Sequence, residues 1–315
     1  MKRRNKWLLT LGITATVVLG AATAAGNYFY SVAIATNKKE FLENDKNLPE
    51  KEKVDIWKAE KEWYQSVQQE TITMTSDDNL TLVATYIPAE KPSKKVAILA
   101  HGYAGNRTNM AAFAKLYYDM GFNILVPDAR GHGESQGDYI GFGWHERLDY
   151  VRWIDEMIAK NGKESEIALF GISMGGATVM MTSGEALPDN VKVIVEDCGY
   201  SSVNEELAYQ LKEMYNLPAF PLVPITSVVT QIRAGYNFDE ASAVKQLEKN
   251  KTPMLFIHGD QDTFVPTEML DEVYTASPAE KEKHIFEGAG HGESYGKHKA
   301  AYKELVTTFI EKYIP

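Results

Sequence analysis

Residues 171–175, Gly-Ile-Ser-Met-Gly, are the strongest candidate for chemistry in this chain. They follow the apolar run Ile167–Phe170, which predicts a strand, and they precede a run that predicts a helix. A serine on such a tight strand-to-helix turn holds its hydroxyl above the sheet, and the flanking glycines leave room for neighbouring backbone. The free N–H groups at the start of the helix favour a developing oxyanion. The pattern predicts that Ser173 is a nucleophile that attacks a carbonyl carbon.

A serine hydroxyl is a weak nucleophile unless a base removes its proton. His291 is the candidate base, because it lies in the glycine-rich loop 288–292 just after the predicted last strand, Lys283–Phe286. A loop of this kind can bring an imidazole to the serine. Of the other histidines, His284 lies within that strand and His298 lies among lysines of the final helix. We expect both to be structural or solvated.

The base needs a carboxylate that fixes its tautomer and stabilises the imidazolium. The loop after the predicted strand Met254–Ile257 offers Asp260 and Asp262. Asp262 is preferred because it lies deeper in the loop, whereas Asp260 is expected to accept hydrogen bonds from backbone in the turn. Asp197, which follows the predicted strand Val191–Val195, is a third candidate for the acid.

Short apolar runs alternate with amphipathic runs along most of the chain. The predicted strands are Thr71–Thr75, Leu80–Ile87, Val96–Ala100, Phe122–Val126, Ile167–Phe170, Val191–Val195, Met254–Ile257 and Lys283–Phe286, and the predicted helices are Asn109–Met120, Trp144–Lys160, Met174–Gly184 and Glu268–Thr275. The first two strands read as an antiparallel hairpin, and the others predict a mostly parallel sheet with helices on both faces. Such sheets carry their sites at the carboxyl ends of the strands, where Ser173, Asp262 and His291 fall. Their order along the chain is that of the α/β-hydrolase fold.

On these motifs the chain resembles the α/β-hydrolase superfamily over about residues 71–313. It is similar in particular to bacterial exported serine hydrolases of the serine aminopeptidase and monoacylglycerol-lipase-like esterase kind. The matching residues are His101-Gly102, the run from Asp128 to Ser135, the turn around Ser173, the Asp262 loop and Gly290-His291. The resemblance implies that the backbone N–H groups of Tyr103 and Met174 form the oxyanion hole. It also implies that His101 braces a loop, and that the 128–135 run, with His132, is a structural turn near the site.

Residues 201–251 interrupt the alternation of strands and helices, since they are too many for one crossover. Two helical patches, Val203–Tyr215 and Ile225–Tyr236, flank the proline-rich turn 217–224. We expect this insertion to form a helical lid over the site.

The N-terminal segment predicts export. Lys2, Arg3, Arg4 and Lys6 precede an uncharged stretch that runs from Trp7 to Thr36. Residues Trp7–Gly26 would cover about 30 Å as a helix, which is enough to cross a bilayer. Basic residues before a span stay in the cytoplasm, so the rest of the chain would lie outside the cell. The alternative is a secretory signal peptide cleaved after the small residues 22–24. The expected domains are a membrane anchor or signal over 1–36, a charged helical stalk over 37–70 and a hydrolase domain over 71–315.

Composition limits the partners. Hydrophobic residues make up 44% of the 315 residues, so the chain can bury a core, and its net charge of −10 argues against a nucleic-acid partner. Cys198 is the single cysteine, which excludes an internal disulfide and a cysteine-rich metal site. The sequence contains no dinucleotide-binding fingerprint, phosphate-binding loop or zinc-binding histidine pair, so neither a cofactor nor a metal is expected.

The predicted function is a serine hydrolase that cleaves a small-molecule acyl substrate through an acyl-enzyme. A carboxylesterase is the preferred reading. A peptidase or amidase, and an acyltransferase or thioesterase, would use the same three residues. A surface protein that uses the fold only for binding is the non-enzyme alternative. The acyl group, the leaving group and the oligomeric state cannot be read from the sequence.

Overall fold

The computed structural model describes residues 20–48 and 55–315. In these residues eight strands form one sheet in the order β1-β2-β4-β3-β5-β6-β7-β8. The strands are β1 (Glu70–Thr75), β2 (Thr81–Ile87), β3 (Lys95–Ala100), β4 (Asn123–Pro127), β5 (Glu166–Ile172), β6 (Val191–Asp197), β7 (Met254–Gly259) and β8 (Lys281–Phe286). β2 runs antiparallel to β1 and β4, and all the remaining pairs are parallel. The predicted hairpin and the mostly parallel sheet are confirmed.

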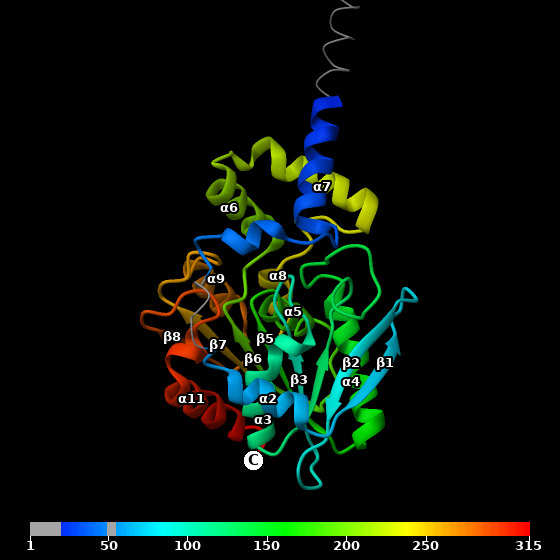
Figure 1. The fold of residues 1–315 in the computed structure, drawn as a ribbon, viewed down its shortest axis with the longest axis vertical. Coiled ribbons are helices and arrows are strands. Elements are labelled where there is room, and N and C mark those ends of the chain that lie inside the picture. The colour runs from blue at the N-terminus through cyan, green and yellow to red at the C-terminus, as the bar shows by residue number, and fades with distance from the viewer. Residues whose placement is uncertain (1–19, 49–54) are drawn as a thin grey trace, which may run out of the picture.

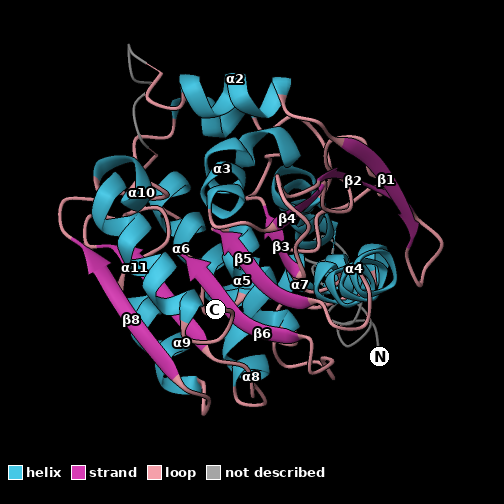
Figure 2. Cartoon of the chain, turned by 90° about the horizontal axis from the view of Figure 1, so that it is seen from below, coloured by secondary structure: helices cyan, strands magenta, loops and turns pink. Residues whose placement is uncertain are grey.

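Helices cover both faces of the sheet (Figure 2). They are α2 (Lys58–Ser66), α3 (Ala111–Asp119), α4 (Glu146–Asn161), α5 (Met174–Thr182), α6 (Val203–Tyr215), α7 (Ala219–Ala234), α8 (Ala243–Leu247), α9 (Glu268–Ala276), α10 (Ser294–Lys297) and α11 (Lys299–Glu311). Side chains of one strand alternate between the two faces: Val96 and Ile98 pack in the core with α4 and α5, whereas Ala97 and Leu99 pack in the core with α3 and α11. The near-continuous apolar runs of the sequence are the result of this double burial.

The segment between β6 and β7 forms three helices, α6, α7 and α8. In Figure 1, α6 and α7 lie above the sheet, apart from the helices that flank it. α6 has the predicted bounds. The second predicted helix is present, but its predicted start was wrong, because α7 begins at Ala219 inside the proline-rich turn and ends at Ala234. Helical backbone is interrupted at Phe220, so Pro221 and Pro224 fall in the first turn of the helix that follows. Proline is tolerated there because its missing N–H would have few partners.

The N-terminal segment packs against α7. Residues 20–29 are helical, and Tyr30–Ile34 continue as a short π-helix. Gly26 lies against Ile225 and Val229 so closely that a Cβ at Gly26 would come within 2.8 Å of both side chains. The predicted span Trp7–Gly26 lies mostly outside the described residues. Across residues 20–48 and 55–315, every helix is too short or too polar to cross a bilayer.

Part of the segment expected as a stalk, 37–70, packs on the hydrolase domain. Tyr64 of α2 is buried, and the ring of Trp63 lies 5.0 Å from the ring of Tyr118 at the end of α3. Lys299, on α11, donates a hydrogen bond to the backbone oxygen of Ile56. These contacts fix α2 against the lower part of the domain (Figure 1). The division of the chain into anchor, stalk and hydrolase domain stays a prediction.

Candidate active site

Ser173 lies on the turn that joins β5 to α5. Its backbone has φ 57° and ψ −122°, a conformation that residues with a side chain rarely adopt. The Ser173 N–H donates a hydrogen bond of 2.8 Å to the backbone oxygen of Asp197, at the end of the neighbouring strand β6. The turn is therefore held by the sheet itself, and strain of this kind is typical of functional sites.

The two glycines of the motif are required by close backbone contacts. A Cβ at Gly171 would lie 2.0 Å from the backbone oxygen of Gly175, and a Cβ at Gly175 would lie 2.1 Å from that of Ala100. No side chain fits at such distances. The spacing of the sequence motif is thus explained by how closely α5 approaches strands β3 and β5.

The structure brings together the three residues predicted to act on the carbonyl. Nε2 of His291 lies 2.8 Å from Oγ of Ser173, and Nδ1 of His291 lies 2.8 Å from Oδ2 of Asp262. If Nδ1 carries the proton and donates it to Asp262, Nε2 is free to accept the proton of the serine. Asp262 and His291 are both buried, so water competes little for these hydrogen bonds.

Asp262 is held in its charged form. Its Oδ1 accepts hydrogen bonds from the backbone N–H groups of Phe264 and Val265, at 3.0 and 2.9 Å. Burial by itself would raise the pKa of Asp262, but His291 and His258 outweigh it and hold that pKa well below its usual range. A carboxylate that stays ionised can stabilise an imidazolium on His291.

His258, at the end of β7, is a participant that sequence reasoning did not assign. Its Nε2 lies 3.2 Å from Oδ2 of Asp262 and 3.0 Å from the backbone oxygen of Val265. Burial by itself would lower the pKa of His258, but the hydrogen bond and charge of Asp262 raise it. His258 lies four residues before Asp262, near the end of a strand, and this position could have indicated that it contacts the Asp262 carboxylate.

The other candidate acids do not contact His291 through a hydrogen bond. Oδ1 of Asp260 accepts from the backbone N–H of Gly288 at 2.6 Å, the turn role that the sequence predicted. Oδ2 of Asp197 accepts from the hydroxyl of Tyr302 at 2.8 Å. Burial raises the pKa of Asp197 to about 6.

The two predicted oxyanion donors flank the serine. Met174 is the first residue of α5, where a backbone N–H has no partner within the helix. Tyr103 follows Gly102, and a Cβ at Gly102 would lie 3.3 Å from Cβ of Ser173, so the loop after β3 passes directly beside the nucleophile. The geometry agrees with the proposed oxyanion hole, which stays a prediction.

His101 and His132 brace the loops on either side of Tyr103 and Asp128 through hydrogen bonds to backbone. Nε2 of His101 accepts from the N–H of Ala129 at 3.0 Å, and Nε2 of His132 accepts from the N–H of Ala104 at 3.3 Å. Burial lowers the pKa of both imidazoles, that of His132 to about 4, so both are neutral at pH 7. Nδ1 of His132 then donates to the backbone oxygen of Arg130. Neither ring is hydrogen-bonded to Ser173.

Two cavities meet at Ser173. The apolar cavity lies between α6, α7 and residues 29–41 and holds about 810 Å³ of empty space, including the part that opens to solvent. Its lining is almost entirely hydrophobic: Phe29, Val32, Ala33, Phe41, Tyr103, Phe142, Met174, Tyr200, Leu207, Leu211, Met214, Tyr215, Leu222, Val223, Phe238, Phe264 and Val265, with Ser173, Glu206, Gln210 and Thr226. The histidine-side cavity is lined by Leu42, Leu48, Gly102, Tyr103, Ile172, Ser173, Phe264, His291 and Gly292.

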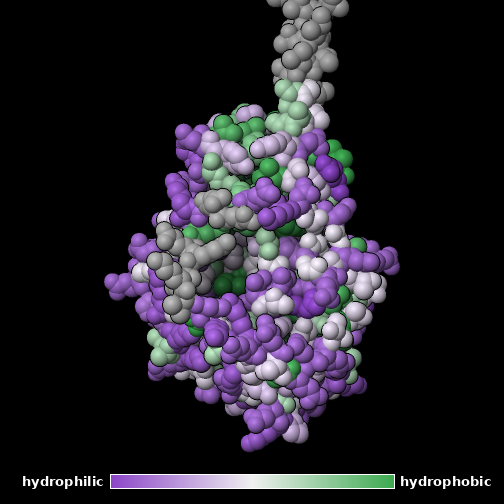
Figure 3. All heavy atoms as spheres, in the orientation of Figure 1, coloured by the Kyte–Doolittle hydropathy of each residue, from purple (hydrophilic) through white to green (hydrophobic). Residues whose placement is uncertain are grey.

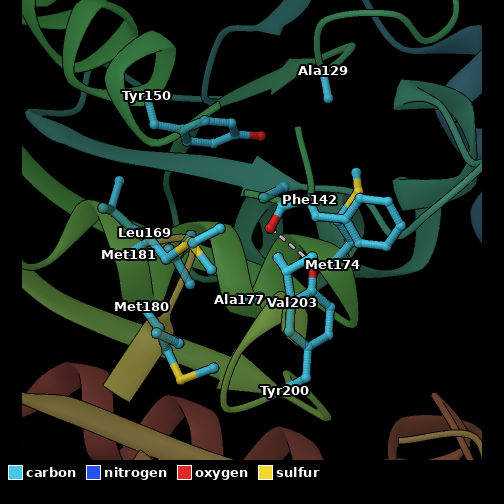
Figure 4. Packing of buried hydrophobic residues seen from close by; sticks show 14 of the residues in the cluster. Ala129, Phe142, Tyr150, Leu169, Met174, Ala177, Met180, Met181, Tyr200 and Val203 are labelled. Atoms are coloured by element: carbon cyan, nitrogen blue, oxygen red, sulfur yellow. Dashed lines mark hydrogen bonds between the residues drawn. The ribbon is translucent and has the colours of Figure 1, made fainter. Parts of the chain in front are cut away.

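Buried aromatic residues support the floor of the apolar cavity. The hydroxyl of Tyr200 donates to the backbone oxygen of Phe142 at 2.9 Å, and both rings pack beside Met174 (Figure 4). This places the cavity wall against the first turn of α5. Of the other aromatic residues near the insertion, Tyr215 lines the cavity, whereas Tyr209 does not.

The N-terminal segment forms one wall of the apolar cavity, which sequence reasoning did not predict. The hydroxyl of Tyr103 donates to the backbone oxygen of Ala33 at 2.7 Å. The buried ammonium of Lys39 donates to the backbone oxygens of Val32, Ala33 and Ala35, at 2.7, 3.2 and 2.6 Å. Burial lowers the pKa of Lys39 to about 8. The Lys39 bonds hold residues 32–39 together, and the Tyr103 bond attaches this segment to the loop after β3.

The sequence profile of the prolyl oligopeptidase family matches residues 105–315, which is more than half of the chain. The chain belongs to the prolyl oligopeptidase family. This member of the family is therefore a serine hydrolase with the α/β-hydrolase fold.

Relatives and neighbours of this prolyl oligopeptidase family member include esterases and a peptidase. The chain is 30% identical over 226 residues to the Bacillus subtilis protein YqkD, covering 72% of this chain and 74% of that one. It is 22% identical over 247 residues to a Bacillus subtilis carboxylesterase, covering 70% and 94%. An esterase of Pyrococcus furiosus has a similar fold, with a TM-score of 0.65, 22% identity and coverage of 86% and 98%. An acylaminoacyl peptidase of Pyrococcus horikoshii has a TM-score of 0.61 at 18% identity, with 79% of this chain and 43% of that chain covered.

Among the described residues, one cluster of cysteine, aspartate and histidine side chains has the spacing of metal ligands. Side-chain atoms of Cys198, Asp262 and His291 lie within 4.8 Å of one another. Metal ligation requires a thiolate, and burial raises the pKa of the Cys198 thiol well above its usual range. His291 is already hydrogen-bonded to Asp262 through Nδ1 and to Ser173 through Nε2. The donor set therefore fits a proton-transfer chain better than a metal centre.

Proposed function

We propose that this serine hydrolase is a carboxylesterase that uses Ser173, His291 and Asp262 in two acyl-transfer steps. Oγ of Ser173 attacks the ester carbonyl while Nε2 of His291 takes its proton. The imidazolium then donates this proton to the leaving alcohol, and the acyl group stays on Ser173. Water, deprotonated by His291, releases the acid and restores the serine. Asp262 orients His291 and stabilises its charged form throughout.

The oxyanion of each tetrahedral intermediate is assigned to the backbone N–H groups of Tyr103 and Met174. Donors of this kind are fixed in place before the reaction, so they stabilise charge that develops only in the transition state. The close approach of Gly102 to Ser173 and the start of α5 at Met174 support this assignment.

The two cavities indicate which side of Ser173 holds the acyl group of the substrate and which side holds the leaving alcohol. The leaving alcohol must receive its proton from His291, and His291 lines the histidine-side cavity but not the apolar cavity. The acyl group therefore occupies the apolar cavity. The apolar lining that ends at Ser173 is the observation on which the proposal rests, because such a lining favours an aliphatic or aromatic acyl chain over a peptide, whose amide groups need hydrogen-bond partners.

The buried Glu206 does not conflict with an apolar acyl chain at neutral pH. Burial raises the pKa of Glu206 to about 8, so the carboxyl is mostly uncharged at pH 7. Its Oε1 accepts a hydrogen bond from Nε2 of Gln210 at 2.9 Å.

KM for an uncharged long-chain ester should therefore increase above pH 8. The carboxyl loses its proton as the pH rises through its pKa, and the charge then faces the acyl chain in the cavity. KM measured from pH 6.5 to 9.5 for the wild type and Glu206→Gln tests this. Glu206→Gln should remove the rise in KM, and an identical rise in both proteins would contradict the role of Glu206.

The acyl assignment is tested with a series of p-nitrophenyl esters from acetate to dodecanoate and with an N-acetylaminoacyl anilide. We expect kcat/KM to increase with chain length and the anilide to be cleaved far more slowly. Val223→Phe, which adds volume to the cavity wall, should lower kcat/KM for the dodecanoate by about tenfold and leave the acetate nearly unchanged.

Val228→Phe is the matched control, because Val228 lies on the same helix with an exposed side chain. Val228→Phe should leave kcat/KM unchanged for both the acetate and the dodecanoate. A preference for the anilide over all esters would instead support a peptidase, the activity named for one structural neighbour. Equal losses on short and long esters in Val223→Phe would contradict the placement of the acyl chain.

The remaining parts of the proposal concern placement in the cell and access to the site. The uncharged stretch from Trp7 to Thr36 behind four basic residues supports an anchor, with the domain at the outer face of the membrane. The position of α6 and α7 over the apolar cavity supports the proposed lid over residues 201–251.

A further inference from the structure

The surface of α6, α7 and the N-terminal helix carries most of the exposed large hydrophobic side chains. Within residues 20–48 and 55–315 there are eight such side chains, and six of them lie here: Tyr28, Tyr215, Leu217, Phe220, Val228 and Ile232. Figure 3 shows hydrophobic residues gathered at this end of the molecule. We call these six residues the apolar surface. Exposed hydrophobic groups that gather in one place indicate an interaction site.

The outward face of α7 is hydrophobic along its length. Pro221, Pro224, Val228 and Ile232 recur at helical spacing and are all exposed, Ile232 to 79%. The opposite side of the helix, with Val223 and Thr226, lines the apolar cavity. α7 contains no acidic residue, although the whole chain has a net charge of −10. Its one charged residue is Arg233, which contacts Asn27 and Tyr30, so the row from Pro221 to Ile232 carries no charge.

The apolar surface continues into the apolar cavity. Tyr215 is exposed at the surface and also lines the cavity. Its ring lies 5.6 Å from that of Phe29, another lining residue, and the ring of Phe29 lies 5.1 Å from that of the exposed Tyr28. A hydrophobic path thus leads from the surface, between α6 and the N-terminal helix, toward Ser173.

The N-terminal helix enters the domain at this same surface. Residues 20–29 rise past α7 at the top of Figure 1. Arg233 of α7 donates to Oδ1 of Asn27 at 3.1 Å and lies over the ring of Tyr30, which fixes the helix to α7. In the sequence, this helix is preceded by uncharged residues back to Trp7 and then by basic residues. A lipid surface is the partner that fits an uncharged segment and an apolar face on one side of the molecule.

We propose that the apolar surface docks on a lipid bilayer and that the acyl chain of an ester held in the bilayer enters the apolar cavity there. The proposal rests on the proposed esterase function and adds the source of its substrate. Docking removes the outer face of α7 from water and places the mouth of the cavity against the lipid, so the acyl chain does not have to cross water. The enzyme then acts preferentially on esters that partition into membranes.

The test compares two substrates and two matched variants of the full chain. The substrates are water-soluble p-nitrophenyl acetate and a long-chain fluorogenic ester dissolved in vesicles of phosphatidylcholine and phosphatidylglycerol. Ile232→Asp places a charge on the apolar surface, and Ile285→Asp makes the same change at an exposed isoleucine on β8. Neither residue lines a cavity at Ser173.

We expect Ile232→Asp to lower the rate on the vesicle-borne ester at least about tenfold and to leave the acetate rate within about twofold. Ile285→Asp should leave both rates unchanged. Equal rates of wild type and Ile232→Asp on the vesicle-borne ester would overturn the proposal. A second result would also overturn it: Ile232→Asp converts a dimer to a monomer but hydrolyses the vesicle-borne ester at the wild-type rate. The apolar surface would then be an interface between two copies of the chain. If the wild type does not hydrolyse the acetate, the esterase function itself is wrong.

Discussion

Ser173→Ala should lower kcat for ester hydrolysis by about 10⁶-fold, which is the largest effect we expect from any single substitution. The change removes the Oγ atom that lies 2.8 Å from Nε2 of His291 and leaves the rest of the site in place. Alanine is the smallest side chain that can occupy the turn, so circular dichroism and the melting temperature should stay close to those of the wild type. Steady-state kinetics with p-nitrophenyl acetate measures the loss.

The pair Ser173 and His291 should behave as one unit. His291→Ala should be nearly as inactive as Ser173→Ala, and the double variant should be no worse than either, because each residue works only through the other. If the loss of kcat in the double variant equalled the product of the two single losses, the two side chains would act in separate steps. Retention of most of the activity in Ser173→Ala would reject the nucleophile.

Asp262→Asn should lower kcat by about 10⁴-fold, whereas Asp197→Asn should lower it by less than about tenfold. The amide of an asparagine at position 262 can donate to Nδ1 of His291 and so favours the tautomer whose Nε2 carries the proton and cannot accept the serine proton. Asp197 has no hydrogen bond to His291 and is held instead by Tyr302, so its loss leaves the tautomer unchanged. The reverse ranking of the two variants would assign the acid to Asp197.

Asp260→Asn provides the matched control for Asp262→Asn, since both aspartates lie in the same loop. Asp260 accepts one hydrogen bond from the backbone N–H of Gly288, and an asparagine can still accept it through its amide oxygen. We expect wild-type kcat for this variant. A large loss would show that the conformation of the loop, and not the charge of Asp262, accounts for the effect.

The parts of the site that could be predicted from the sequence are those determined by local structure. The turn at Ser173 needs glycines at 171 and 175 because backbone of α5 and of the neighbouring strand β3 lies too close for a side chain. The two glycines and the serine between them form a five-residue pattern that can be recognised in the sequence. Asp262 and His291 lie in loops directly after strands, where the fold brings loops from distant parts of the chain to one edge. The central strands were found because double burial makes each of them a nearly uninterrupted apolar run, whereas most residues of the edge strands β1 and β8 are not buried.

The parts that could not be predicted depend on packing between distant segments. Nothing local to residues 29–41 indicates that they line a cavity beside Ser173, because their partners are α7 and the loop at Tyr103. Lys39 reads as one of many charged residues, although it is buried against three backbone oxygens. The start of α7 was misplaced because prolines end helices in most positions but are tolerated in a first turn.

The most direct test of the central assignment is to map the adduct formed with a fluorophosphonate probe, which phosphonylates an activated serine. We predict one phosphonyl group on the peptide that contains Ser173, no adduct in Ser173→Ala, and much slower labelling in His291→Ala. An adduct on a different residue of the wild type, with Ser173 unmodified, would contradict the assignment. So would labelling of Ser173→Ala at the wild-type rate.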